Sequence, residues 1–186
     1  MTLPRAFYNR ATVEVARDLL GKVLVHGETA GIIVETEAYL GGDDLASHSA
    51  AGITDRTRVI FGPPGHAYVY LSYGMHDCLN IVAEPRGTPG CVLIRALEPV
   101  AGLDIMRSRR PRARSDRDLA SGPGKLTRAL GITRQHTGVD VTMGELSVQS
   151  GQSGDLEIAV TPRIGITNCA DWPLRFYILG NPYVSR

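Results

Sequence analysis

The segment 32–39 (IIVETEAY) is the part of the sequence that most constrains the fold. Its β-branched residues and short length predict a β-strand. Because successive side chains of a strand alternate between its two faces, Glu35, Glu37 and Tyr39 share one face. Burying an unpaired carboxylate costs on the order of several kcal/mol, a cost that proteins accept most readily at a functional site. The pattern therefore predicts either a buried acidic site or an edge strand whose polar face lies in solvent.

The length and composition predict one globular domain that covers residues 1–186. No apolar run approaches the length of a membrane span, and the N-terminus lacks a signal-peptide pattern, so we expect a cytoplasmic protein outside the membrane. The three cysteines, Cys78, Cys91 and Cys169, are widely spaced, which indicates buried reduced thiols and not a disulfide or zinc set. We expect neither a metal nor a cofactor.

Positive charge is concentrated in one segment, although the net charge of the chain is only +1. Six arginines lie between positions 107 and 117, and their mutual repulsion predicts that the Arg-rich segment 106–119 is a flexible loop. Lysine, in contrast, occurs only at Lys22 and Lys125. This scarcity argues against a mechanism in which a lysine amine forms a Schiff base with the substrate.

Hydrophobic periodicity and turn residues predict a mixed fold. Helices are expected at 12–20, 103–109 and 125–130. Strands are expected at 22–26, 31–40, 67–72, 78–83, 91–97, 156–160, 163–167 and 174–179. The sequence thus predicts a single α+β domain with a curved, mostly antiparallel β-sheet, a site on its concave side and surrounding helices.

Three of the seven tyrosines fall within six positions, at Tyr68, Tyr70 and Tyr73. Aromatic faces stack on nucleobases and contribute about 1–3 kcal/mol per base. The alternative is an aromatic cluster in the hydrophobic core. We favour the core for Tyr68 and a functional role for Tyr73, because a large aromatic side chain before a glycine turn is hard to bury.

Isolated polar residues in apolar surroundings are further candidates. Arg95 lies in an apolar strand and requires a carboxylate partner, which Glu37 or Glu98 could supply. A structural ion pair and a catalytic role are both open for it. Asn80 is a strand amide whose donors and acceptor need partners. His48, in a polar loop, is by itself more often a surface residue than a site residue.

Lys125 follows Gly-Pro-Gly and superficially resembles the lysine of a phosphate-binding loop. The full motif fails, because Leu119 stands where its first glycine belongs and Leu126 replaces its Ser or Thr. The predicted helix N-terminus and Lys125 could still hold a phosphodiester.

Taken together, these segments resemble the alkyladenine (3-methyladenine, methylpurine) DNA glycosylase family. The resemblance runs in order along nearly the whole chain. It is carried by VETEAY at 34–39, SHS at 47–49, YVYLSYGM at 68–75, CLN at 78–80, VLIRALEP at 92–99, SGPGKL at 121–126, PLRFY at 173–177 and PYVS at 182–185. His76 and Asp77 depart from the aromatic residues expected after Met75, and the Arg-rich segment has no fixed counterpart.

The resemblance implies a monomeric, monofunctional enzyme of base excision repair that flips damaged purines out of double-stranded DNA and hydrolyses their N-glycosidic bond. In this interpretation Glu37 activates a water molecule and Arg95 helps to hold it. The other implied roles are a base pocket at Tyr39, His48, Tyr70 and Asn80, a DNA-intercalating wedge at Tyr73 and a DNA-backbone contact at Lys125.

Two other functions remain open from the sequence. One is hydrolysis of ordinary O-glycosides by Glu35 and Glu37, which stand about 6.6 Å apart at the backbone of a strand, near the separation found in inverting glycosidases. Their side chains point the same way, however, whereas a glycosidase needs carboxyls on both sides of the bond. The other is a nonenzymatic nucleic-acid-binding module that uses the Arg-rich segment.

Overall fold

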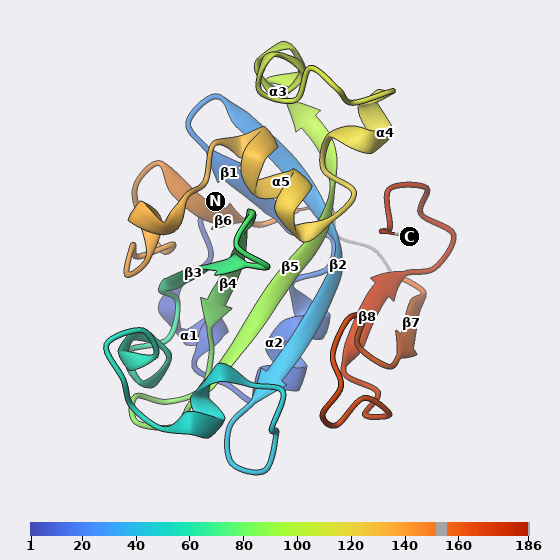
Figure 1. Cartoon of the computed structure of the whole chain (residues 1–186). Coiled ribbons are helices and arrows are strands. Elements are labelled where there is room, and N and C mark those ends of the chain that lie inside the picture. The colour runs from blue at the N-terminus through green and yellow to red at the C-terminus, as the bar shows by residue number, and fades with distance from the viewer. Residues whose placement is uncertain (152–155, 186) are drawn as a thin grey trace.

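Two long antiparallel strands, β2 (Thr29–Leu40) and β5 (Gly90–Ala101), run through the centre of the fold (Figure 1). The computed structural model describes residues 1–151 and 156–185. The sheet has the strand order β3-β4-β5-β2-β1-β6, with β8 also paired to β2 and β7 paired to β8. The remaining strands are β1 (Val23–His26), β3 (Ala67–Ser72), β4 (His76–Val82), β6 (Leu146–Gln149), β7 (Ile158–Thr161) and β8 (Arg175–Ile178). All these pairs are antiparallel, as the sequence predicts.

Strand β2 is an inner strand where it carries Glu35 and Glu37. Its first part pairs with β1, and its later part, at Glu35, Thr36 and Glu37, pairs with β8. Along the other side it pairs with β5. The alternative of an edge strand with solvated carboxylates is therefore wrong, and both Glu35 and Glu37 are fully buried.

Helices cover the sheet at several places. The α-helices are α1 (Arg5–Tyr8), α2 (Thr12–Asp18), α3 (Leu103–Arg109), α4 (Asp116–Leu119) and α5 (Pro123–Leu130), and short 3-10 helices are η1 (His48–Ala51), η2 (Arg58–Phe61) and η3 (Arg134–His136). Helix α2 packs on β2 and β5, and α5 packs on β4 and β5. The Thr36 hydroxyl donates to the Ala16 carbonyl of α2 at 2.8 Å. Helix α2 thus covers the face of β2 opposite to Glu37.

The Arg-rich segment differs from the predicted loop, because it begins and ends in helices. Met106 and Leu119 are buried and anchor it to the core. Arg107 makes ion pairs with Asp104 and Asp116, so acidic residues interleaved with the arginines offset their repulsion. Only residues 110–115, between α3 and α4, lie outside a helix, and the expectation of a loop over the whole segment counted the arginines and not these aspartates.

Other departures are local. The predicted strand at 163–167 has no regular structure, because the Arg163 side chain and the Ile164 backbone N–H bond to the side chains of Asp44 and Glu37. Strand β6 was not predicted. Across the described ranges, no helix has the length and apolar character needed to cross a membrane.

Candidate active site

Two carboxylates and one guanidinium meet in the interior where β2 and β5 pair. Arg95 Nε donates to Glu35 Oε1 at 3.0 Å, and Arg95 Nη1 lies 3.3 Å from Glu37 Oε1. The strand register shifts on both sides of Glu35, from Ile33 opposite Leu97 to Thr36 opposite Ile94. Such β-bulges redirect side chains next to active sites. Here the shift coincides with the placement of Arg95 between the two carboxylates.

Glu37 has a partner on each of its oxygens. Oε1 accepts from the Ile164 backbone N–H at 2.8 Å as well as from Arg95, and Oε2 accepts from the Tyr39 hydroxyl at 2.9 Å. Burial, followed by the Glu37 carboxylate, raises the pKa of Tyr39, so the phenol stays protonated and donates. Burial opposes the charge of Arg95, but Glu37 and Glu35 outweigh it and raise the Arg95 pKa. The cluster therefore holds a charged guanidinium against buried carboxylates.

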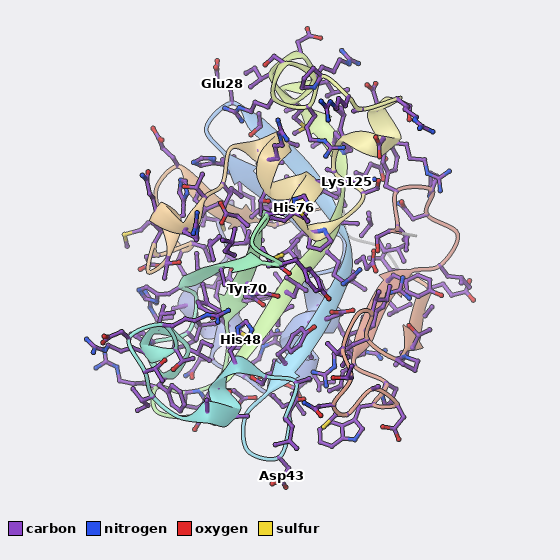
Figure 2. All side chains as sticks on the ribbon, in the orientation of Figure 1. Glu28, Asp43, His48, Tyr70, His76 and Lys125 are labelled. Carbon is purple, nitrogen blue, oxygen red and sulfur yellow. The ribbon has the colours of Figure 1, made fainter. Side chains whose placement is uncertain are left out.

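An aromatic cavity of about 260 Å³ lies next to this cluster. It is lined by Tyr39, His48, Tyr68, Tyr70, Asn80 and Tyr73, together with Ala46, Arg56, Leu71, Ser72, Cys91, Gly165 and Ile166. The His48 ring meets Tyr70 edge-on at 4.5 Å between centroids, and Tyr68 stacks on Tyr70 at 5.7 Å. Figure 2 shows His48 and Tyr70 close together in the middle of the molecule. Because the Tyr39 hydroxyl also bonds Glu37, it connects the cavity to the carboxylate.

His48 is a neutral hydrogen-bonding residue of this cavity. Its Nδ1 lies 2.9 Å from the Tyr68 hydroxyl, and its Nε2 lies 3.4 Å from Arg56 Nη2. Burial, and then the Arg56 guanidinium, lower the pKa of His48 to about 4. At neutral pH the ring is uncharged and can stack or hydrogen-bond without adding positive charge.

Asn80 lies at the inner wall of the cavity, and Tyr73 lies at its mouth. Asn80 is buried, and its Nδ2 donates to the Tyr68 carbonyl at 3.2 Å. Tyr73 is 81% exposed and has a positive φ of 49° in the turn between β3 and β4, an uncommon conformation for a residue other than glycine. Its exposure agrees with the expectation that this tyrosine is hard to bury. Tyr68 belongs to a buried cluster, as expected, but it also lines the cavity.

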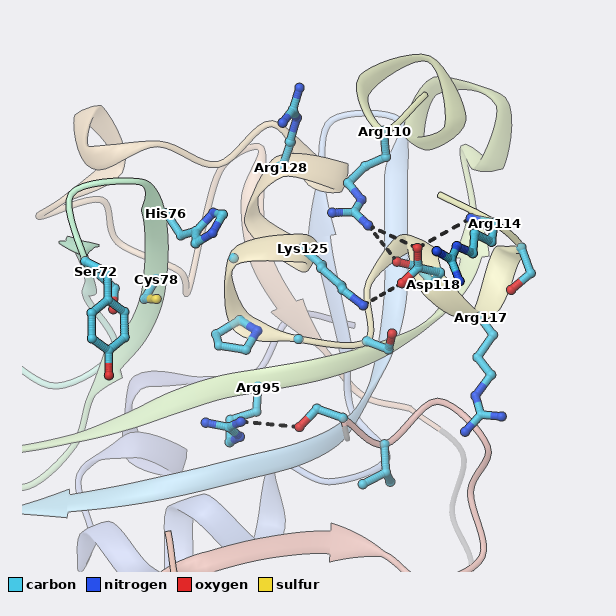
Figure 3. Close-up of a pocket in the computed structure, with 18 residues that line it drawn as sticks. Ser72, His76, Cys78, Arg95, Arg110, Arg114, Arg117, Asp118, Lys125 and Arg128 are labelled. Atoms are coloured by element: carbon cyan, nitrogen blue, oxygen red, sulfur yellow. Dashed lines mark hydrogen bonds and ion pairs between the residues drawn. The ribbon is translucent and has the colours of Figure 1, made fainter. Parts of the chain in front are cut away.

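A second, larger cleft of about 860 Å³ begins at Ser72 and Tyr73, which line both cavities. Its basic side chains are Arg95, Arg110, Arg114, Arg117, Lys125 and Arg128 (Figure 3). Asp118 lies among them and bonds Lys125 Nζ at 2.5 Å and Arg110 Nη2 at 3.5 Å. The cleft therefore combines an exposed tyrosine, a dense positive charge and one carboxylate.

Several residues of the buried cluster were missed. Of the two partners expected for Arg95, Glu37 is confirmed and Glu98 is wrong, because Glu98 accepts from Asn181 instead. The second partner is Glu35, which also binds Arg175 Nε at 2.7 Å. The spacing of Glu35 and Glu37 could have indicated that Glu35 also pairs with Arg95, because both glutamates lie on one side of the strand.

Two further missed residues, Arg163 and Asp44, form a fully buried ion pair, with Nη1–Oδ2 at 2.7 Å and Nη2–Oδ1 at 2.8 Å. Arg163 also lies over the Tyr39 ring, with 4.7 Å between its guanidinium carbon and the ring centroid. Arg163 thus packs against Tyr39, one of the aromatic residues that line the cavity. Among residues 1–151 and 156–185, no group of three or more His, Cys, Asp or Glu side chains is arranged to hold a metal ion.

Comparison with known proteins places this geometry in context. Residues 6–182 match the family model for methylpurine-DNA glycosylase. A protein of Methanoculleus marisnigri, provisionally named as a 3-methyladenine DNA glycosylase, is 56% identical over 193 residues, which cover 100% of both chains. Proteins with the same provisional name from Methanocella arvoryzae and Koribacter versatilis are 53% and 51% identical, covering 99% and 98% of this chain and 96% and 92% of their own.

Proposed function

The chain belongs to the methylpurine-DNA glycosylase family, and from this premise we propose that it is a monofunctional glycosylase that hydrolyses the N-glycosidic bond of damaged purines in duplex DNA. The observation that carries the proposal is the buried Glu37–Arg95 pair, which the Tyr39 hydroxyl links to an aromatic cavity. A base that has been rotated out of the duplex enters this cavity, because an enzyme cannot reach the bond while the base is stacked.

Glu37 is the proposed general base. A carboxylate offers about four lone-pair sites. Two sites on Oε1 are taken by Ile164 N–H and Arg95, whereas Oε2 accepts only from Tyr39. Oε2, the oxygen that Tyr39 links to the cavity, thus has a site left that accepts a proton from the attacking water. The negative charge of Glu37 also stabilises the positive charge that develops on the sugar.

The cavity residues hold the flipped base. Tyr39, Tyr70 and His48 supply aromatic faces, and the neutral His48 adds hydrogen bonding without repelling a cationic alkylated base. Asn80 fills the inner wall, where its amide excludes bases that carry an extra amino group.

The exposed face binds the DNA. Tyr73 enters the space that the flipped base leaves and offsets the cost of unstacking, which is about a few kcal/mol. The basic side chains of the larger cleft, Lys125 among them, contact the DNA phosphates. The protein acts as a monomer, so that one molecule binds one lesion.

The geometry argues against an O-glycosidase. Glu35 accepts hydrogen bonds from Arg95, Arg175 and Ser185, so it does not offer a free acid on the far side of a sugar bond. A nonenzymatic binding module, in turn, has no need for the buried carboxylate beside the cavity.

One assay tests the proposal. The protein is incubated with duplexes that each contain a single alkylated, deaminated or etheno purine, and the strands are analysed with and without alkali. We expect base release and strand breakage only after alkali, with no protein–DNA adduct when borohydride is present. An adduct would indicate amine catalysis by Lys22, Lys125 or the N-terminus, and no release from any duplex would reject the glycosylase.

A further inference from the structure

The segment 182–185 returns to the buried carboxylates of β2. Ser185 is buried, and its backbone N–H donates to Glu35 Oε2 at 2.7 Å. Its hydroxyl lies 2.9 Å from Glu35 Oε1 and 3.3 Å from Arg95 Nη2. Val184 and Ser185 both line the basic cleft beside Arg95. Ser185 is thus 150 positions from Glu35 in the sequence but contacts it in the fold. It lies between the buried ion pairs and the cleft that is proposed to bind DNA.

The hydrogen-bond directions at Ser185 follow from its neighbours. A guanidinium can only donate and an ionised carboxylate can only accept. The Ser185 hydroxyl therefore accepts from Arg95 Nη2 and donates its proton to Glu35 Oε1. One hydroxyl joins the two charged groups, a task that alanine cannot perform and threonine can.

These contacts fix the orientation of Arg95 at three points. Nε bonds Glu35, Nη2 bonds Ser185 and Nη1 is left for Glu37 at 3.3 Å. A planar guanidinium that is held at Nε and Nη2 has no remaining freedom to turn Nη1 away from Glu37.

Arg95 also lines the cleft that is proposed to bind DNA. A phosphate that enters this cleft competes with Glu37 for the guanidinium, because arginine binds phosphate and carboxylate with the same paired donors. Some contact on the protein side must oppose this competition if Arg95 is to serve the water site while DNA is bound.

We infer that Ser185 and Glu35 are positioning residues that keep Arg95 directed at Glu37 when DNA occupies the cleft. This inference rests on the proposed glycosylase function. The Ser185 hydroxyl occupies Nη2 and so withholds this donor from a phosphate in the cleft, and its removal frees Nη2 for the DNA.

The test compares Ser185→Ala, Ser185→Thr and the neighbouring control Tyr183→Phe, which removes a hydroxyl outside both the cleft and the aromatic cavity, in single-turnover excision from a lesion-containing duplex. We expect Ser185→Ala to reduce the excision rate by about tenfold, the effect of one hydrogen bond that acts through Arg95. Ser185→Thr should restore most of the rate, and Tyr183→Phe should excise normally. Melting temperatures should be similar in all variants.

Salt dependence of DNA binding separates positioning from general support of the fold. If Arg95 turns to a phosphate in Ser185→Ala, the slope of log K against log[salt] should steepen by about 0.9, whereas a merely structural role leaves it unchanged. A normal excision rate in Ser185→Ala, an unchanged slope, or a loss that threonine does not rescue would overturn the inference. A wild-type protein that excises nothing would instead overturn the proposed function, and the inference with it.

Discussion

The protein contains two networks of arginine and carboxylate that differ in their access to water. In the buried network of Glu35, Glu37 and Arg95 the side chains are 0%, 0% and 9% exposed. In the cleft network of Asp118, Arg110 and Lys125 they are 29%, 16% and 41% exposed. The residue types are alike, but water and salt screen the second network and not the first.

The difference in screening separates two tasks. Charges in the dry network are held in fixed positions, since removing any partner leaves a buried charge uncompensated. Such fixed charges suit the stabilisation of a transition state. In the cleft, Lys125 and Arg110 can exchange Asp118 for a phosphate at small cost, because partly exposed ion pairs contribute little net stability. The proposed chemistry and the proposed DNA binding thus rest on networks of different burial.

The largest expected effect comes from removing Glu37, the proposed general base of the buried network. Glu37→Gln keeps the size and most hydrogen bonds of the side chain but removes its charge and basicity. General-base assistance contributes about 10²–10⁴-fold, so single-turnover excision should fall by at least about a hundredfold while lesion binding persists. The matched control is Glu35→Gln, which we expect to reduce the rate far less. A Glu37→Gln variant with nearly normal excision would remove Glu37 from the proposed mechanism.

The second prediction compares a buried ion pair with exposed ion pairs. Arg163→Met leaves Asp44 charged and fully buried, so the free energy of unfolding should fall by about 3–5 kcal/mol. The control is Arg107→Met, which breaks exposed pairs with Asp104 and Asp116 and should hardly change the melting temperature. Chemical denaturation of both variants measures the difference. Equal losses would mean that burial does not distinguish the two kinds of pair.

The third prediction tests whether Tyr73 belongs to the DNA-binding surface. Because this side chain is 81% exposed, Tyr73→Ala should leave thermal stability nearly intact. It should weaken binding to lesion or abasic-site DNA by about tenfold or more, since the unstacking cost of a few kcal/mol is no longer offset. Binding titrations and thermal melts decide between the roles. Lower melting temperature with normal DNA affinity would place Tyr73 among the residues that support the fold.

Much of the fold and part of the site could be predicted, because the relevant signals are local in sequence. Strand alternation grouped Glu35, Glu37 and Tyr39, and the glycine after Tyr73 indicated an exposed aromatic. Residues that share a strand or a turn have a fixed geometry, whatever the rest of the chain does.

The rest depends on contacts between residues far apart in the chain. Arg163 and Asp44 are separated by 119 positions and Ser185 and Glu35 by 150, so no spacing indicates either pair. The register shift beside Glu35 arises from pairing with β5 and leaves no mark on the alternation of β2. These contacts complete the surroundings of Arg95 and Tyr39, which the sequence identified without their partners.

The smallest expected effect concerns the exposed arginines of the cleft. Arg114 and Arg117 line the cleft, whereas Arg112 is exposed outside it. If the first two bind phosphates, the double change Arg114→Ala and Arg117→Ala should reduce the slope of log K against log[salt] by about 0.9 for each phosphate that is no longer neutralised. Because these side chains touch neither the buried network nor the aromatic cavity, the excision rate at saturating protein should stay the same. Arg112→Ala should leave the slope unchanged, and a slope that depended equally on all three arginines would show that their position relative to the cleft does not matter.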